Sequence, residues 1–358
     1  MPQHSTANTA TSILREYASH TGLAPTIEPF SREGTLAQRL KANPFIMAPM
    51  AGVSDAAYRM MARAGGAVLA YSEMVSVAGL HYGGVKTWEL VVPQDPEPDI
   101  AVQLFGSEPS QFSEAVELVQ ERLGDKLSLI DINMACPVPK VTRKGEGSAL
   151  LEDPKRAAAI VDACVSKATV PVTVKIRSAR RTGEPEVAPT FAQAMEQAGT
   201  AAVAVHGRTA SQMYRGQADW GVVSRVVDAV SIPVIGSGDV RSPQDAAAML
   251  AQTGATAVMV ARGTYGNPWV FGDAARALAG EEVGEVPIGQ RIAAFCCHVR
   301  LLEATDAHLA RARSLSGWYL RGIPHAAQWR DRAMQCSTVD EYLALAQAVA
   351  GLVEDGER

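Results

Sequence analysis

The chain has 358 residues, a net charge of −5 and 47% hydrophobic residues. This length allows a large core and more than one domain, and the acidic balance excludes a global field that would draw the protein onto nucleic acid. The five cysteines lack metal-ligand spacing, and no apolar run reaches the roughly 18–20 residues of a membrane helix, so we expect a cytoplasmic protein without disulfides, metal or membrane contact.

The N-terminal residues are rich in Ser, Thr and Ala and lack the apolar core of a signal peptide. We therefore expect residues 1–30 to form a flexible, loosely ordered extension. A short apolar strand follows, and Ser54 or Asp55 then caps a helix that Gly65 and Gly66 end. Similar apolar runs recur along the chain, and we predict eight strands at 44–47, 67–71, 100–105, 127–132, 171–177, 201–205, 232–235 and 255–260.

The eight predicted strands alternate with helices, which is typical of parallel βαβ units. Units of this number and size predict an α/β fold, a closed (β/α)8 TIM barrel over residues 31–282. An open, doubly wound sheet is the alternative, but no Gly-x-Gly-x-x-Gly turn follows the first strand. From residue 288 to 358 the sequence predicts helices only, at 291–304, 308–321, 326–336 and 339–353, so we expect a separate C-terminal all-helical domain.

The fourth predicted strand ends in a polar loop. The apolar run at 127–132 stops at Asn133, and Cys136 and Pro137 precede a loop rich in Lys, Arg and Gly. Pro137 cannot donate to a sheet ladder, so the strand must end before it. A lone cysteine is usually buried and unreactive, but an amide and a thiol here lie just past the carboxyl end of a barrel strand, where ligands bind.

Polar side chains also follow or end the other predicted strands. A Gln within a barrel strand and a Lys between two apolar residues are costly to bury unless they are paired. Each has a structural alternative: Lys175 could pair with Asp131 or Asp239, and His206 could cap a loop. Because the carboxyl ends of barrel strands share one face, the whole set favours a polar ligand site formed by Met50, Gln103, Asn133, Cys136, Lys175, Arg177, His206, Arg208, Asp239 and Arg262.

Glycine-rich loops follow the last two predicted strands. Residues 236–239 read Gly-Ser-Gly-Asp, and residues 261–263 read Ala-Arg-Gly. In barrels these two loops commonly bind phosphate, and Arg262 can add a charge-assisted contact. Turns need glycine in any case, but beside a polar pocket the two loops indicate a phosphorylated cofactor such as FMN.

Taken in order, these segments resemble the bacterial, FMN-dependent tRNA-dihydrouridine synthases. The resemblance extends from about residue 46 to residue 271 and more weakly into the helical tail. The cysteine after the Asn-x-x motif separates this family from most other flavin barrels. The matching segments are Ala48-Pro49-Met50-Ala51-Gly52, Val102-Gln103-Leu104, Asp131-Ile132-Asn133-Met134-Ala135-Cys136-Pro137, Val174-Lys175-Ile176-Arg177, His206-Gly207-Arg208-Thr209 and Gly236-Ser237-Gly238-Asp239-Val240.

The resemblance implies an FMN-binding catalytic barrel and a tRNA-binding helical domain, in a monomer. It implies reduction of the C5–C6 double bond of specific uridines in tRNA to 5,6-dihydrouridine, with NADPH (or NADH) reducing the flavin. Hydride passes from flavin N5 to uracil C6, and Cys136 gives a proton to C5. A thiol with a pKa near ~8.5 stays mostly protonated at neutral pH, as a general acid must.

The resemblance also implies roles for the other residues of the site. Gln103 bonds the flavin edge, and Lys175 stabilises the reduced flavin anion. The implied cofactor-binding residues are Pro49, Met50, Ala51, Gln103, Lys175, His206, Ser237, Gly238, Asp239, Ala261 and Arg262; those for the substrate are Asn133, Arg177 and Arg208; those for RNA are Arg311 and Arg313.

Four residues depart from the family pattern. Ala135 stands where relatives usually have Gly, and Ser237 stands where they have Asn. A left-handed Ala would cost roughly 1–2 kcal/mol, so we expect an ordinary backbone at Ala135. In the tail, Ser314 and Leu315 replace a Lys-His pair, which weakens the inference of RNA binding relative to that of flavin binding.

Two other functions fit part of the pattern. A flavin barrel that reduces a free pyrimidine or another small metabolite, as dihydroorotate dehydrogenase-like enzymes do, explains the barrel but not the helical tail. An RNA-binding protein without turnover is disfavoured by the intact Cys136, Lys175, Gln103 and His206.

Overall fold

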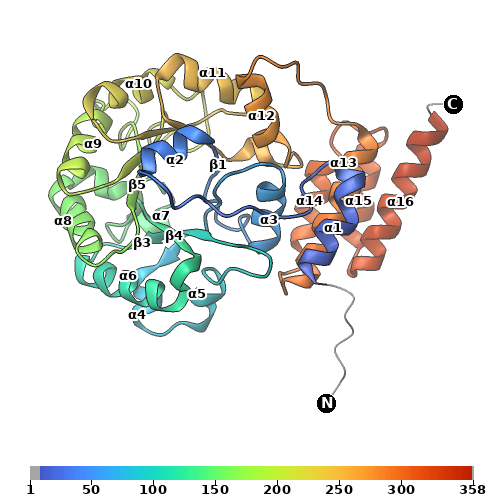
Figure 1. Ribbon diagram of the computed structural model, residues 1–358, viewed down its shortest axis with the longest axis horizontal. Coiled ribbons are helices and arrows are strands. Elements are labelled where there is room, and N and C mark those ends of the chain that lie inside the picture. The colour runs from blue at the N-terminus through green and yellow to red at the C-terminus, as the bar shows by residue number, and fades with distance from the viewer. Residues whose placement is uncertain (1–8, 357–358) are drawn as a thin grey trace.

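The computed structural model describes residues 9–356 and shows a barrel with a bundle of helices at one side (Figure 1). The strands form one sheet, ordered β1-β8-β7-β6-β5-β4-β3-β2, and all neighbouring strands are parallel. This arrangement confirms the predicted (β/α)8 barrel. The strands are β1 (Phe45–Met47), β2 (Val75–Ser76), β3 (Ile100–Phe105), β4 (Leu127–Asn133), β5 (Val172–Arg177), β6 (Ala202–His206), β7 (Val234–Ser237) and β8 (Ala257–Val260).

The segment 67–72 closes the ring between β1 and β3. It forms single bridges to Met47 on one side and to Ala101 on the other. The Met47 N–H donates to Leu69 O at 2.9 Å, and the Ala101 N–H donates to Ala70 O at 3.0 Å. The strand predicted at 67–71 is therefore present only as two bridges, because β1 and β3 each pair with a single residue of this segment. Regular pairing with β3 begins at β2.

Helices cover the outside of the barrel (Figure 1). Five of them, α6, α7, α8, α9 and α11, carry proline in the first turn, where its missing N–H is not needed and its fixed φ suits a helix. The helices of this part are α2 (Leu36–Ala42), α3 (Ala56–Ala64), α4 (Val77–His81), α5 (Val85–Glu89), α6 (Pro109–Leu123), α7 (Pro139–Thr142), α8 (Pro154–Val165), α9 (Ala188–Gln197), α10 (Trp220–Ala229), α11 (Pro243–Thr253) and α12 (Val270–Leu278).

Side chains fill the lower part of the barrel interior. Bulky Tyr71, Leu129 and Ile235 pack there against small alanines such as Ala202 and Ala204, and all five are almost fully buried. Alternation of large and small side chains packs such an interior without a pore. A ligand can therefore enter the barrel only above this layer, at the carboxyl ends of the strands, where polar side chains replace the apolar ones.

The C-terminal helices form a bundle beside the barrel (Figure 1). Apolar side chains of α3, α12 and the bundle belong to one continuous core that includes Tyr58, Phe271, Phe295 and Tyr319. The two parts therefore share buried surface as well as a linker. Among residues 9–356, no helix is long and apolar enough to cross a membrane. The bundle consists of α13 (Ile288–Ala304), α14 (Arg311–Tyr319), α15 (Ala326–Gln335) and α16 (Val339–Gly356).

The N-terminal extension is more ordered than the sequence indicates. Helix α1 (Ala10–Thr21) is capped by the Thr9 hydroxyl, ends at a left-handed Gly22 and packs along α13. Its apolar side chains, Ile13 and Leu14, are buried in the core of the bundle. The predicted loose extension is therefore wrong for this segment, because its few apolar residues share one helix face. The first eight residues lie outside the described part.

Replacing Ile13 with Ala should lower the free energy of unfolding by about 2–5 kcal/mol, because the buried side chain leaves a cavity between α1 and α13. Urea unfolding measures this loss. Arg15→Ala is the matched control, since Arg15 is exposed on the same helix. A loss no larger than that of the control would show that α1 adds nothing to the stability of the fold.

Candidate active site

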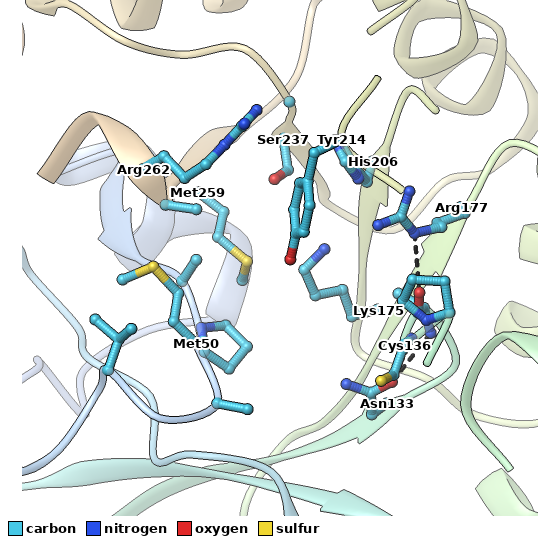
Figure 2. Close-up of a pocket in the computed structure, with 18 of the residues that line it drawn as sticks. Met50, Asn133, Cys136, Lys175, Arg177, His206, Tyr214, Ser237, Met259 and Arg262 are labelled. Carbon is cyan, nitrogen blue, oxygen red and sulfur yellow. Dashed lines mark hydrogen bonds between the residues drawn. The ribbon is translucent and has the colours of Figure 1, made fainter. Parts of the chain in front are cut away.

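A cavity of about 380 Å³ opens at the carboxyl ends of the strands (Figure 2). Its wall is formed by strand ends and by the loops that follow them, as expected for a barrel. The residues predicted from the sequence that line it are Pro49, Met50, Ala51, Gln103, Asn133, Cys136, Lys175, Arg177, His206, Ser237, Gly238, Asp239, Ala261 and Arg262.

The alternation of strand residues explains why these side chains meet. Successive strand residues point to opposite faces, so every second residue faces the barrel interior. On β4, Leu129 belongs to the packed interior layer, and Asn133, four residues on, lines the cavity. On β6, Ala204 belongs to the same layer and His206 follows it into the cavity. On these two strands an apolar residue therefore lies below and a polar residue above, whereas on β8 the apolar Met259 itself lines the cavity.

A buried polar network lies at the floor of the cavity. Asp131 is fully buried and accepts from Gln103 Nε2 at 2.7 Å and from Thr173 Oγ1 at 2.6 Å. Burial raises the pKa of the Asp131 carboxyl to about 6, although these two hydrogen bonds and Lys175 oppose the shift. Gln103 Oε1 accepts in turn from Asn133 Nδ2 at 2.7 Å. Both ends of the Gln103 amide are thus bound within the protein.

Asn133 positions the turn that carries the thiol. Its Oδ1 accepts the backbone N–H groups of Ala135, at 3.1 Å, and of Cys136, at 2.8 Å. Arg177 Nε donates to the Ala135 carbonyl at 2.9 Å, and Figure 2 shows it beside this turn. Ala135 has no positive φ, which confirms the ordinary backbone expected there. The Cys136 side chain is therefore held by a fixed backbone rather than by a mobile loop.

The environment of Cys136 favours the protonated thiol. The side chain is half-buried, and burial raises its pKa, while the Val138 N–H and the charge of Arg177 act in the opposite direction. The Cys136 carbonyl accepts from the Ser148 N–H at 3.0 Å, and a Cβ at Gly147 would lie 2.8 Å from that carbonyl oxygen. This close approach requires glycine. Burial thus keeps the Cys136 thiol protonated at neutral pH.

Positive charge gathers on one side of the cavity. Lys175 extends into the cavity (Figure 2), and its Nζ has no hydrogen-bond partner within residues 9–356. Burial and the neighbouring Arg177 lower the pKa of Lys175 to about 8. The pKa of His206 is lowered well below its ordinary value by burial and then by Lys175 and Arg177, so its imidazole is neutral. This side of the cavity suits an electron-rich or anionic ligand.

The loops after β7 and β8 form the other end of the cavity. Gly238 has a φ of +117°, and a Cβ there would lie 2.7 Å from the Ala218 and His206 side chains. The Asp239 carboxylate accepts from Arg208 at 2.7 Å and lies 3.3 Å from the Arg262 guanidinium. Burial opposes its ionisation, but the Ala218 N–H and Arg208 outweigh burial and lower the pKa of Asp239. Asp239 therefore orders these loops and holds Arg262 at the cavity.

The sequence model of dihydrouridine synthase (Dus) matches residues 46–354 of this chain. The chain belongs to the dihydrouridine synthase family. It is 39% identical over 313 residues to tRNA-dihydrouridine synthase B of Xanthomonas axonopodis pv. citri, covering 84% of this chain and 90% of that protein. Identity is 36% both to tRNA-dihydrouridine synthase B of Pseudomonas aeruginosa, covering 84% and 93%, and to the probable tRNA-dihydrouridine synthase 1 of Synechocystis, covering 83% of each.

Arg208 differs from the expectation drawn from the family. Its side chain is 0% exposed; Nε donates to Arg215 O at 3.0 Å and Nη2 donates to Asp239. The expected contact of Arg208 with the substrate is therefore wrong, because a buried guanidinium between two loops cannot reach a ligand. Arg177 lines the cavity, but it also binds the carbonyls of Thr209 and Met213 at 3.0 and 3.1 Å.

The two tail arginines have different environments. Arg313 is exposed on α14, as a contact with RNA requires. Arg311 instead lies between carboxylates of the barrel, 3.0 Å from Asp55 and 2.9 Å from Glu73. The charge of its guanidinium is therefore already paired with two carboxylates of the protein, which contradicts the expectation that it binds the RNA backbone. Leu315 is buried in the core of the bundle.

The sequence did not single out several residues of this dihydrouridine synthase cavity. Tyr214 is 60% exposed at the cavity, and the Arg262 guanidinium lies 4.9 Å from its ring centroid. Met74 Sδ lies 3.7 Å from Asn133 Nδ2. Both come from irregular loops without periodicity. The sequence did carry a signal for the buried polar network: Asp131 is a carboxylate in an apolar strand, two residues before Asn133.

The alkylation rate of Cys136 should reach half its maximum at a pH above the ordinary thiol pKa of about 8.5. Burial disfavours the charged thiolate, which is the reactive form, so the rate should stay low through neutral pH. Mass spectrometry of the Cys136 peptide after iodoacetamide pulses at increasing pH measures this midpoint. The urea-unfolded chain is the control, and a folded midpoint at or below the unfolded one would contradict the assignment.

Proposed function

We propose that this protein reduces the C5–C6 double bond of specific uridines in tRNA to 5,6-dihydrouridine, with FMN as cofactor and NADPH (or NADH) as reductant. The observation that carries the proposal is a thiol, held protonated by burial, at a cavity with an unpaired lysine. Family membership and the printed names of the relatives support the substrate. A buried, fixed thiol is suited to give a proton rather than to act as a nucleophile.

The residues of the cavity fit FMN. The apolar residues Pro49, Met50 and Ala51 form a wall for a flat ring, and Lys175 offers a charge to its pyrimidine part. At the other end, glycines allow close approach of a ligand, and a Cβ at Gly263 would lie 2.6 Å from a backbone oxygen. The exposed guanidinium groups of Arg241 and Arg262 can bind a phosphate.

The proposed reaction adds one hydride and one proton across the double bond. When bound, reduced FMN supplies the hydride to uracil C6. Cys136 gives its proton to C5, becomes a thiolate, and regains a proton from solvent. Asn133 keeps the thiol in place through the backbone N–H of Cys136, and the charges of Lys175 and Arg177 favour electron density on the bound rings.

The mouth of the cavity suits a nucleic acid. The segment after Cys136, α7 and the turn that follows it, carries the exposed cations Lys140, Arg143 and Lys144, although the whole chain is acidic. Such cations attract phosphates and position a polynucleotide without reading its sequence. We therefore place the RNA over this loop, with Arg313 of the helical domain as a further contact.

Dihydrouridine should form in unmodified tRNA but not from free uridine when the protein, FMN and NADPH are combined. The cations at the cavity mouth supply affinity only to a polyanion, which a free nucleoside is not. Mass spectrometry of the digested RNA and of the nucleoside reaction measures the product. Equal or faster reduction of free uridine would favour the small-metabolite reductase.

The apoprotein should take up one FMN per chain and become yellow. Lys175→Met should weaken this binding by about ten- to a hundredfold, because a charge-assisted contact contributes roughly 1.5–3 kcal/mol. Isothermal titration with FMN measures both affinities. Lys155→Met, which changes an exposed lysine on α8, is the control. A folded apoprotein that does not bind FMN would contradict the cofactor assignment.

Cys136→Ala should reduce tRNA turnover by about 10²–10⁴-fold, the usual contribution of a general acid. FMN binding and NADPH oxidation should stay near wild type, since the thiol serves only the proton step. Stopped-flow absorbance separates flavin reduction from its reoxidation by tRNA. Cys336→Ala in the helical domain is the matched control. Wild-type turnover by Cys136→Ala would remove the thiol from the mechanism.

A further inference from the structure

We propose that Arg311 is a positioning residue that couples the docking of the helical domain to the affinity of the cavity for FMN, an inference that rests on the proposed function. Arg311 is the first residue of α14. Its guanidinium leaves the bundle and lies between two carboxylates of the barrel, Asp55 and Glu73. Neither carboxylate lines the cavity, but each accepts a hydrogen bond from a segment next to it: Asp55 from the start of α3, and Glu73 from Gly52.

Glu73 connects Arg311 to the cavity wall. One of its carboxylate oxygens accepts from Arg311 Nη2 at 2.9 Å, and the other accepts the backbone N–H of Gly52 at 2.6 Å. Glu73 is only 8% exposed, so both contacts are shielded from water. Gly52 has a φ of +76° and lies in the turn that begins at Met50 and ends at Val53. A single carboxylate thus joins α14 to this turn.

The turn from Met50 to Val53, called here the wall turn, faces the cavity. Met50, Ala51 and Val53 all line it. Within the barrel the turn is held by Ser54, whose hydroxyl donates to the Met50 carbonyl at 3.1 Å and accepts the Met50 N–H at 3.0 Å. Among the described residues, Glu73 is the side chain that binds the Gly52 N–H at the tip of the turn.

Asp55 provides the second connection. Its Oδ1 caps α3 by accepting the Tyr58 N–H at 2.8 Å, and its Oδ2 lies 3.0 Å from Arg311 Nη1. Burial raises the pKa of Asp55, the charge of Arg311 opposes this shift, and Glu73 adds to it. Without Arg311, Arg59 would still lie near Asp55 and Glu73, but Arg59 is already paired with Glu97. The repulsion between the two carboxylates would therefore grow in a nearly closed interface, where it is poorly screened. The loss of one cation would therefore displace Glu73 and with it the wall turn.

A second contact of α14, at Trp318, explains how the bundle can influence the flavin site at a distance. Trp318, on the last turn of α14, stacks on Tyr265 of the cavity with ring centroids 4.0 Å apart. Helix α14 thus contacts the cavity region at both ends, through an ion pair at Arg311 and through an aromatic pair at Trp318. A shift of this helix would change both contacts together, so the position of the helical domain and the shape of the cavity form one coupled system.

Arg311→Ala should raise the Kd of FMN by about tenfold, within the range usual for coupled sites. Isothermal titration of the apoproteins with FMN measures this, and circular dichroism checks that each variant is folded. Arg311→Lys, which keeps the charge, should restore part of the affinity. Arg330→Ala is the matched control, because it removes an exposed arginine of α15 in the same bundle and should leave the Kd within about twofold of wild type.

Glu73→Gln distinguishes the proposed relay from general loosening of the bundle. The neutral amide can still accept the Gly52 N–H but loses the contact with Arg311, so its FMN Kd should rise as it does in Arg311→Ala. The double variant should bind no more weakly than either single variant, because both break one connection. Additive losses, an unaffected Glu73→Gln or an Arg311→Ala Kd within about twofold of wild type would each overturn the inference. Failure of the wild-type apoprotein to bind FMN would instead overturn the proposed function.

Discussion

The buried carboxylate of Asp131 is the constraint on which the site depends. An ionised carboxylate only accepts hydrogen bonds, so the Gln103 amide must turn its NH₂ group toward Asp131. The Gln103 carbonyl then faces Asn133, which must offer its own NH₂ group. The Asn133 carbonyl is thereby left for the N–H groups of Ala135 and Cys136. The polarity of one carboxylate is transmitted through two amides and sets the position of the thiol.

The electrostatics of the cavity arise from burial more than from charge count. Lys175, Arg177 and His206 lie close together in a buried region, where Arg177 disfavours a positive charge on Lys175 and both disfavour one on His206. Burial raises the pKa of the nearby thiol at the same time. A single environment therefore keeps the Cys136 thiol protonated and the His206 imidazole neutral, and it lowers the pKa of Lys175. An electron-rich ligand relieves the crowding of cations, which gives the cavity its preference.

The helical bundle packs closely against the barrel. Tyr58 of α3 packs against Trp318 and His298 of the bundle, with ring centroids 6.1 and 5.4 Å apart. At Gly266, a Cβ would lie 2.6 Å from the Trp318 backbone, so these two segments of the chain touch at a point where only glycine fits. Close backbone packing of this kind transmits displacement, because interiors have no free volume to absorb it.

The sequence alone determined the barrel, because the periodicities of strands and helices are local features of the chain. Eight strands that alternate with helices then leave few closed arrangements. It also predicted most of the side chains that meet at the cavity, since in a parallel barrel every strand ends on one face, but it included Arg208 wrongly and missed Tyr214 and Met74. It could not determine how the polar groups are paired. Arg208 and Arg311 are equivalent to any other arginine in the sequence, but folding places one in a buried ion pair and the other between two carboxylates. Likewise, Ile13 and Leu14 became core residues only because α13 offers them an apolar face. Partners distant in the chain decide the environment of a charge or of a short helix, and only the tertiary structure brings them together.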